Sequence, residues 1–287
     1  MQTLQVFQSL WAMETGLVPA LADSLEVTIA RIADAGFDGV CLDPCLADVD
    51  HYRSVIPLLR KHKLASMVNL FPTAADEMLP LLAFAREAGS VKVSAVAQVM
   101  PLTPADAVPL IHRWLREARQ MGIELLFETH RDSLLNDLFF TLQVLDAVPE
   151  LKLTADLSHI VINREFGLPL SARDQDFIAR LHERSDCFQG RVATREQIQV
   201  PLAFAQHQPW VTLFKGFWKD GMRSWRRRNG PDAECVFVCE LGPPGYAITD
   251  ADGNELSDRW QEALTIQRWA RAAWAELVAE SVSRAVS

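Results

Sequence analysis

The chain has 287 residues, with 28 lysines and arginines against 37 aspartates and glutamates, which gives a formal charge of −9. Hydrophobic residues make up 49% and charged residues 23%, a globular balance that excludes a disordered chain. No apolar run reaches the roughly 18 residues of a membrane span. The acidic charge argues against a nucleic-acid partner, because phosphates demand lysine and arginine.

The cysteines and the N-terminus indicate the compartment. The five cysteines are odd in number, and none lies in a Cys-x-x-Cys pair. Residues 1–11 have no basic segment, so we expect no signal peptide. A reduced, cytoplasmic protein is the simplest expectation.

A recurrent order of helix, glycine and strand organises the chain. Gly36 precedes residues 37–43, Gly89 precedes 91–100 and Gly122 precedes 123–128. Each glycine suits the left-handed position that closes a helix. Each following run is short and apolar, as buried parallel strands are.

Helices are predicted by apolar residues spaced three or four positions apart. Ser, Thr or Asp before such a stripe is expected to cap the helix. The clearest stripes are Leu25, Ile29 and Ile32 after Asp23 or Ser24; a helix opened by Thr103 with Pro104 and Asp106; Leu134, Leu138, Leu142 and Leu145; and Ile266, Trp269, Ala273 and Leu277.

Eight strands are predicted, and helical patterns separate them all. They are residues 4–10, 39–43, 65–70, 91–100, 124–128, 152–156, 187–192 and 236–240. Eight strand–helix units in a chain of this length predict an α/β protein with a single (β/α)8 TIM barrel. No linker or change of composition divides the chain, so we expect one domain over residues 1–287.

Acidic residues end three of the later strands. Glu128 ends the fifth, Asp156 the sixth and Glu240 the eighth. Active sites of such barrels lie at the carboxyl ends of the strands, so these side chains are expected at one mouth. Several carboxylates at one mouth repel each other unless a cation lies between them. The alternative is that each pairs with a nearby arginine or caps the next helix.

Oxygen ligands, with an imidazole or amide beside them, suit a hard or borderline divalent cation. The sequence therefore predicts one divalent metal ion. Mn or Mg is favoured, and Zn and Co are the alternatives.

Three motifs at these strand ends carry a family resemblance. They are Glu-Thr-His at residues 128–130, Ala-Asp-Leu-Ser-His at 155–159 and Cys-Glu-Leu-Gly-Pro at 239–243. With them the chain resembles the xylose-isomerase-like TIM barrels, which include sugar and sugar-phosphate isomerases and epimerases. The resemblance covers nearly the whole chain in strand order.

The resemblance implies a metal-ligand set. The family usually holds its metal with a Glu, an Asp, a His and a Glu on four successive strands, which match Glu128, Asp156 and Glu240 here. The seventh strand departs from the family form His-x-Arg, since it reads Gln189-Gly190-Arg191. Gln189 offers an amide oxygen, and its position implies the fourth ligand.

Three further residues are expected to bind the substrate. His159 lies three residues after Asp156, where the family often has a substrate-binding histidine. His130 and Arg191 each lie two residues after an expected ligand, so they face the same side of an extended segment. Arg191 suits a hydroxyl, carboxylate or phosphate, and the alternative is an ion pair with Glu128 or Asp156.

Other polar residues are weaker candidates. Lys92 and Gln98 in the fourth strand, and Trp11 and Glu14 after the first, are placed near the mouth. The basic run 223–228 is expected to be a solvated helix end, a lid or an oligomer contact rather than a nucleic-acid site, which leaves a homo-oligomer open. The remaining histidines are expected at the surface; they are His51, His62, His112, His182 and His207.

The function expected is a metal-dependent sugar isomerase or epimerase acting on a ketose or keto-sugar. Glu128 and Glu240 flank the substrate, and one removes a proton next to the carbonyl while the other returns it. Loss of a β-hydroxyl instead gives a dehydratase or lyase. A non-catalytic sugar-binding barrel is the alternative that Gln189 raises. An endonuclease-like phosphodiesterase is disfavoured, because the mouth has few histidines and the chain is acidic.

Overall fold

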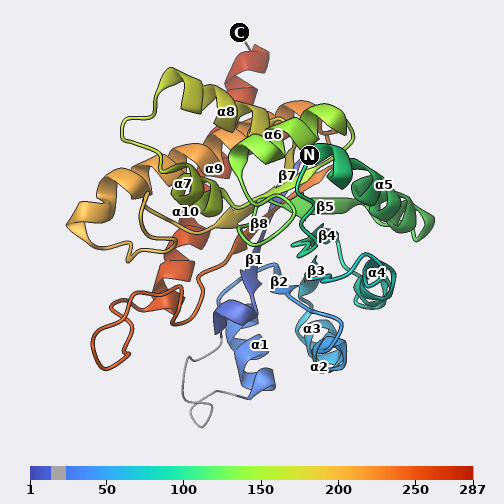
Figure 1. The fold of residues 1–287 in the computed structure, drawn as a ribbon. Helices are drawn as coiled ribbons and strands as arrows, with labels where there is room; N and C mark the ends of the chain where they lie inside the picture. The colour runs from blue at the N-terminus through green and yellow to red at the C-terminus, as the bar shows by residue number, and fades with distance from the viewer. Residues whose placement is uncertain (14–23, 287) are drawn as a thin grey trace.

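The computed structural model describes residues 1–13 and 24–286. Its eight described strands form a closed parallel barrel in the order β1 to β8, and Figure 1 shows the helices around it. The predicted (β/α)8 fold is therefore confirmed. Two residues named above, Glu14 and Asp23, lie outside the described residues.

The elements alternate along the chain as the sequence predicts. In order they are β1 (Thr3–Ser9), η1 (Trp11–Met13), α1 (Leu25–Asp34), β2 (Gly39–Leu42), α2 (Val49–Arg53), α3 (Ile56–His62), β3 (Ala65–Leu70), α4 (Met78–Glu87), β4 (Lys92–Ala95), α5 (Pro104–Gln120), β5 (Leu125–Glu128), α6 (Leu138–Ala147), β6 (Leu153–Ala155), α7 (Leu157–Arg164), α8 (Ala172–His182), β7 (Ser185–Gly190), η3 (Ala205–His207), α9 (Gln208–Arg228), β8 (Glu234–Cys239) and α10 (Arg259–Val286).

Local sequence signals set the helix ends. Gly36, Gly89 and Gly122 all have positive φ, as the helix–glycine–strand pattern predicts. The side chain of Ser24 accepts a hydrogen bond from the backbone N–H of Val27 and caps α1. Thr103 caps α5 in the same way through Asp106. These caps satisfy N–H groups that would otherwise lack a partner.

Three element predictions are corrected. The strand expected over residues 91–100 is β4, which ends at Ala95. Leu134 lies before α6, because Asp137 caps that helix. In α10, Ile266 and Leu277 are buried as expected, but Trp269 is only partly buried and packs under the ammonium group of Lys215.

Inward-facing side chains fill the barrel below its mouth. They are Phe7, Cys41, Met67, Leu126, Cys187, Val236 and Val238. A second, larger apolar layer lies between the strands and the surrounding helices. The mouth is therefore closed from beneath by a packed interior, as in other barrels of this kind.

Ion pairs occupy the amino end of the barrel. Lys92 begins β4 and pairs with Glu124 at 3.1 Å, so its predicted place near the mouth is wrong. Asp186 on β7 pairs with Lys152 at 3.2 Å and with Arg228 at 2.9 Å. The basic run 223–228 is thus the end of α9, one of the predicted roles.

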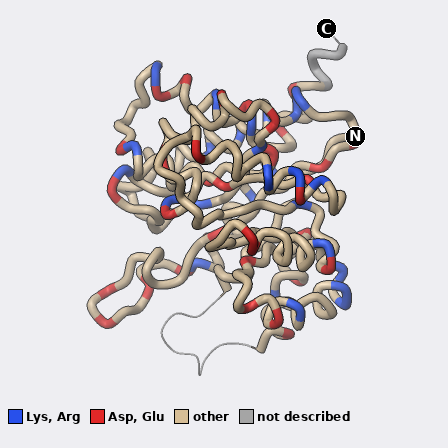
Figure 2. Tube along the Cα trace, turned by 45° about the vertical axis from the view of Figure 1, so that its right-hand side comes forward, with Lys and Arg blue, Asp and Glu red and all other residues tan. Residues whose placement is uncertain are grey.

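Charges of both signs are interspersed over the outer helices in the view of Figure 2. Two of the five histidines expected at the surface are buried instead. His182 packs against Phe217, and His207 bonds to the backbone carbonyl of Pro201. In the described part of the chain, no helix has the length and apolar character needed to cross a membrane.

Candidate functional site

The three predicted carboxylates converge at the mouth of the barrel. Glu128 is the last residue of β5, Asp156 follows β6 and Glu240 follows β8. One oxygen of each lies within 4.8 Å of the others, and these three residues form the carboxylate cluster. The exposed fractions of these residues are 2%, 0% and 7%. Parallel strands of similar length end at one rim, which is why residues so far apart in the sequence meet.

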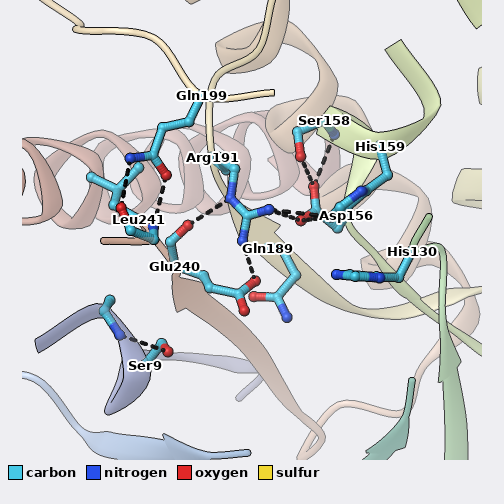
Figure 3. A network of polar contacts seen from close by, with 12 residues as sticks. Ser9, His130, Asp156, Ser158, His159, Gln189, Arg191, Gln199, Glu240 and Leu241 are labelled. Carbon is cyan, nitrogen blue, oxygen red and sulfur yellow. Dashed lines mark hydrogen bonds and ion pairs between the residues drawn. The ribbon is translucent and has the colours of Figure 1, made fainter. Parts of the chain in front are cut away.

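Arg191 links two of the three carboxylates. Its guanidinium nitrogens lie 3.2 Å from an oxygen of Asp156 and 3.0 Å from an oxygen of Glu240. Its Nε–H donates to the backbone carbonyl of Glu240 (Figure 3). The alternative that these carboxylates pair with an arginine therefore holds for Asp156 and Glu240. Among the described residues, Arg191 is the only Lys or Arg in ion-pair contact with the cluster.

Asp156 also caps a helix. Its Oδ1 accepts the backbone N–H of Ser158 at 2.9 Å and the Ser158 hydroxyl at 2.5 Å, which opens α7. Its Oδ2 faces Arg191 and lies 3.5 Å from Nε2 of His159. One oxygen thus holds the helix, while the other is turned toward the cluster.

Gln189 supplies an amide to the cluster. Its Nε2 donates to Glu128 at 3.1 Å, and its buried Oε1 has no hydrogen-bond partner. Gly190 follows because a side chain there would collide with the ring of Phe237 on β8. The close approach of β7 and β8 therefore places Gln189 and Arg191 beside Glu240, and Figure 3 shows these side chains together.

The three buried carboxylates have too little positive charge beside them. Burial raises the pKa of Glu128 well above its usual value, and the nearby Glu240 and Asp156 raise it further. It also raises the pKa of Glu240 to about 8, although Arg191 opposes the shift. Three carboxylates and one guanidinium would carry two net negative charges if all were ionised. The site holds this charge only with protons or with a cation.

The two predicted histidines lie against each other. The rings of His130 and His159 are 3.9 Å apart, and His159 Nε2 lies 3.2 Å from a guanidinium nitrogen of Arg191. Burial lowers the pKa of His130 to about 4 and that of His159 well below its usual value, and Arg191 lowers both further. Both rings are therefore neutral at neutral pH.

A cavity of about 400 Å³ opens beside the cluster. It lies over the ends of β1 to β5 and reaches Glu240 and Tyr246 after β8, and Glu240 and His130 lie where it meets the carboxylates. Its lining residues are Trp11, Asp43, Cys45, Asp48, Tyr52, Phe71, Gln98, His130, Glu240 and Tyr246. The size suits a small ligand. His159 and Arg191 are buried behind this lining, so their predicted contact with substrate stays a prediction.

Tyr246 is a site residue that the sequence analysis missed. It lies in the loop after β8, and its ring contacts Trp11 at 5.1 Å and the guanidinium of Arg191 at 4.7 Å. A side chain at Gly242 would collide with both Trp11 and Tyr246. The glycine after the Cys-Glu-Leu motif was the available signal for this close packing.

Asp43 was also missed, although its signal matches that of Asp156. It follows the last residue of β2, at the same rim as the three carboxylates. The amide of Asn69 on β3 donates to it at 3.1 Å, and the hydroxyl of Ser9 lies 3.5 Å away. The second strand therefore ends in an acidic residue, as the fifth, sixth and eighth do.

The residues present fit a divalent cation. Three buried carboxylates exceed their one arginine by two charges, and the Gln189 oxygen lacks a partner. All these donors are oxygens, which hard cations such as Mg and Mn prefer. The predicted metal site is thus supported as a buried acidic triad, and the identity of the ion is not decided by it.

Three solved structures with a similar fold have the names of sugar enzymes. A D-allulose 3-epimerase from Methylomonas sp. in complex with D-allulose has a TM-score of 0.59 at 14% identity, over 94% of this chain and 97% of that one. An L-ribulose 3-epimerase has a TM-score of 0.58 at 14% identity, over 99% and 97%. A xylose isomerase domain protein from Planctomyces limnophilus has a TM-score of 0.54 at 12% identity, over 96% and 97%.

Sequence comparison adds nothing further. No family model and no curated protein matches the chain. The chain shares the (β/α)8 barrel fold of these structures, and identities of 12–14% limit the conclusion to the fold.

Proposed function

We propose that the protein is a metal-dependent sugar isomerase or epimerase that moves a proton at the carbon next to a carbonyl. The observation that carries this proposal is the convergence of Glu128, Asp156 and Glu240, with one arginine paired to two of them, beside a cavity of small-molecule size. The fold that the chain shares with sugar epimerases supports it by analogy.

Glu128 and Glu240 are the proposed acid and base. They come from strands β5 and β8, so they approach a bound substrate from different sides. Burial raises the pKa of both in the metal-free chain, and a bound cation would oppose this shift by favouring the carboxylate form that can accept a proton. Return of the proton to the same carbon gives an epimer, and return to the neighbouring carbon interconverts aldose and ketose.

Glu128, Asp156, Glu240 and the free oxygen of Gln189 would hold the divalent ion. When bound, the ion supplies a Lewis acid that stabilises negative charge on the substrate oxygens. Arg191 keeps Glu240 and Asp156 oriented through its two ion pairs and its bond to the Glu240 carbonyl. Tyr246 and Trp11 cover the guanidinium and keep water from it.

His130 is proposed to contact the substrate, because it lines the cavity next to Glu240. His159 is proposed to fix the ring of His130 and the position of Arg191, since it contacts both. A metal-dependent dehydratase or lyase would use the same residues. A cytoplasmic location and a sugar or sugar derivative as the small-molecule partner belong to the same proposal.

Metal analysis and proton exchange together test the proposal. Protein purified without chelator should contain close to one divalent ion per chain, and should exchange a substrate proton with heavy water for at least one ketose. A non-catalytic binding barrel would bind sugar without exchange. No metal binding by calorimetry, with Arg191 alone balancing the cluster, would refute the metal-dependent function.

A further inference from the structure

The mouth of the barrel has two chemically different parts. The carboxylate cluster and Arg191 lie over β5 to β8, whereas the cavity extends from Glu240 and Tyr246, after β8, across the ends of β1 to β5. Under the proposed function, the reacting carbonyl lies at the cluster. The rest of the substrate then extends into the cavity.

The far half of the cavity offers hydrogen-bond acceptors. Asp43 lines it and is held by Asn69, whose amide donates to Oδ1 at 3.1 Å. Asp48 also lines it, with one oxygen accepting the backbone N–H of Cys45 at 2.8 Å. These oxygens suit partners that donate hydrogen bonds.

No lysine or arginine is among the described residues that line the cavity. The guanidinium groups of Arg131 and Arg191 lie against the ring of Tyr246, 4.9 and 4.7 Å from its centre. Residues 14–23, outside the described part, contain no lysine or arginine in their sequence. A phosphate or carboxylate in this half would face Asp43 and Asp48 without a cation to pair with, which is unfavourable.

We propose that Asp43 is a specificity-determining residue that selects substrates whose far end donates hydrogen bonds, through a hydroxyl or an ammonium group, and rejects phosphorylated ones. This inference rests on the proposed function, because it takes the cluster as the reacting end. The aromatic side chains of Trp11, Tyr52, Phe71 and Tyr246 complete a wall that suits the carbon skeleton of a sugar or an ammonium group.

Three matched ligands test the proposal in calorimetry with the full chain. The probes are D-allulose, its 6-amino-6-deoxy derivative and its 6-phosphate. Each is measured with excess Mn²⁺ and without it, so that direct binding of the phosphate to the ion is distinguished from binding to the protein. The hydroxyl and ammonium probes should bind at least about tenfold more tightly than the phosphate, because the charge of Asp43 acts over a few ångströms. The ratio of the first two shows which donor the site prefers.

The variant Asp43→Asn keeps an acceptor for Asn69 and removes the charge. It should reduce the ratio of the dissociation constants of the phosphate and hydroxyl probes several-fold, and Asp48→Asn should reduce this ratio less. This ratio is the gap between the two probes. Asp34→Asn, which removes the same charge from an exposed position at the end of α1, should leave the gap unchanged. A melting curve of each variant shows that it is folded.

Three results would overturn the inference. They are phosphate binding as tight as hydroxyl binding, a gap that Asp43→Asn does not change, and binding of none of the three probes. Loss of the proposed function is distinguishable: a preserved preference without any proton exchange would refute the reaction and leave the specificity of the cavity standing. Proton exchange with the phosphate bound most tightly would do the reverse.

Discussion

At the amino end of the barrel, the buried Asp186 has two cations, Lys152 and Arg228. At the carboxyl end, three carboxylates are buried together, and Arg191 pairs with only two of them, Asp156 and Glu240. Both ends carry buried acidic side chains on or next to strands of the same barrel. The amino end balances its carboxylates within the protein. The carboxyl end leaves two negative charges that only protons or a bound cation can balance.

The difference shows what each end is for. Paired charges at the amino end add to stability and need no partner from solution. The excess at the carboxyl end costs stability in the absence of a ligand, and such strained sites are typically functional. Predictions that perturb one end and spare the other therefore test this division directly.

The largest effect is expected from the proposed acid and base. Glu128→Gln and Glu240→Gln should each lower the rate of substrate proton exchange by about 10²–10⁴-fold, because each removes a proton carrier. The rate is measured in heavy water with metal in excess, so that reduced metal occupancy does not imitate lost catalysis. Near wild-type exchange in either variant would exclude that residue as acid or base.

Metal affinity should fall next, and only at the carboxyl end. Asp156→Asn keeps the oxygen that caps α7 but removes the charge facing Arg191, so it should weaken metal binding by about 100-fold or more in calorimetry. Asp186→Asn at the amino end is the control and should leave the metal dissociation constant unchanged. Equal weakening in both variants would contradict a local metal site.

The pH dependence of stability should reveal the excess charge. Folding raises the pKa of Glu240 to about 8, so the folded, metal-free chain binds more protons than the unfolded chain from about 4.5 up to 8. Its stability should then fall as the pH rises through this range, by about 2 kcal/mol between pH 6.5 and 8. Urea unfolding of the metal-free protein at each pH measures this change.

That window separates the carboxylates from the buried histidines. Burial lowers the pKa of His182 to about 4, so its contribution is lost as the pH falls below about 6.5 and is constant above it. Glu240→Gln should flatten the decline between pH 6.5 and 8, and saturating Mn²⁺ should do the same. A decline that survives both changes would have another origin.

Loss of a pair at the amino end should cost stability alone. Asp186→Asn removes the partner of Lys152 and Arg228, both partly exposed, so solvent screening limits the loss to about 1–2 kcal/mol in urea unfolding. Mn²⁺ should not change this loss of stability, whereas it should reduce the pH-dependent loss that comes from Glu240. If the loss in Asp186→Asn depends on Mn²⁺, the two ends are not independent.

The smallest effect is expected at Gln189, where the chain departs from the family pattern. Gln189→Ala should weaken binding of the metal ion by about tenfold or less, because a neutral amide oxygen is a weak ligand. Gln189→His should raise affinity and shift selectivity toward Zn or Co. An unchanged dissociation constant in Gln189→Ala would remove it from the ligand set, and its Nε2–H bond to Glu128 would then be its role.

The strand ends could be predicted from the sequence because the end of a buried parallel strand has a short local pattern. An apolar run followed by a polar residue located Glu128, Asp156 and Glu240, and the barrel brings them together as predicted. The same pattern is present at Asp43, which follows the apolar strand β2. The extent of β4 was overestimated, since Val96 and Ala97 after its end are also apolar and buried.

By itself, the sequence determined the order of strands and helices, the glycines with positive φ and the carboxylates at the strand ends, because all these follow from neighbours a few residues apart. Only the tertiary structure decided that Arg191 pairs with Asp156 and Glu240, that Tyr246 packs over the guanidinium, and that the cavity lies toward Asp43. These contacts join residues far apart in the chain. Their distances depend on how strands and loops pack around the closed barrel, which no local pattern encodes.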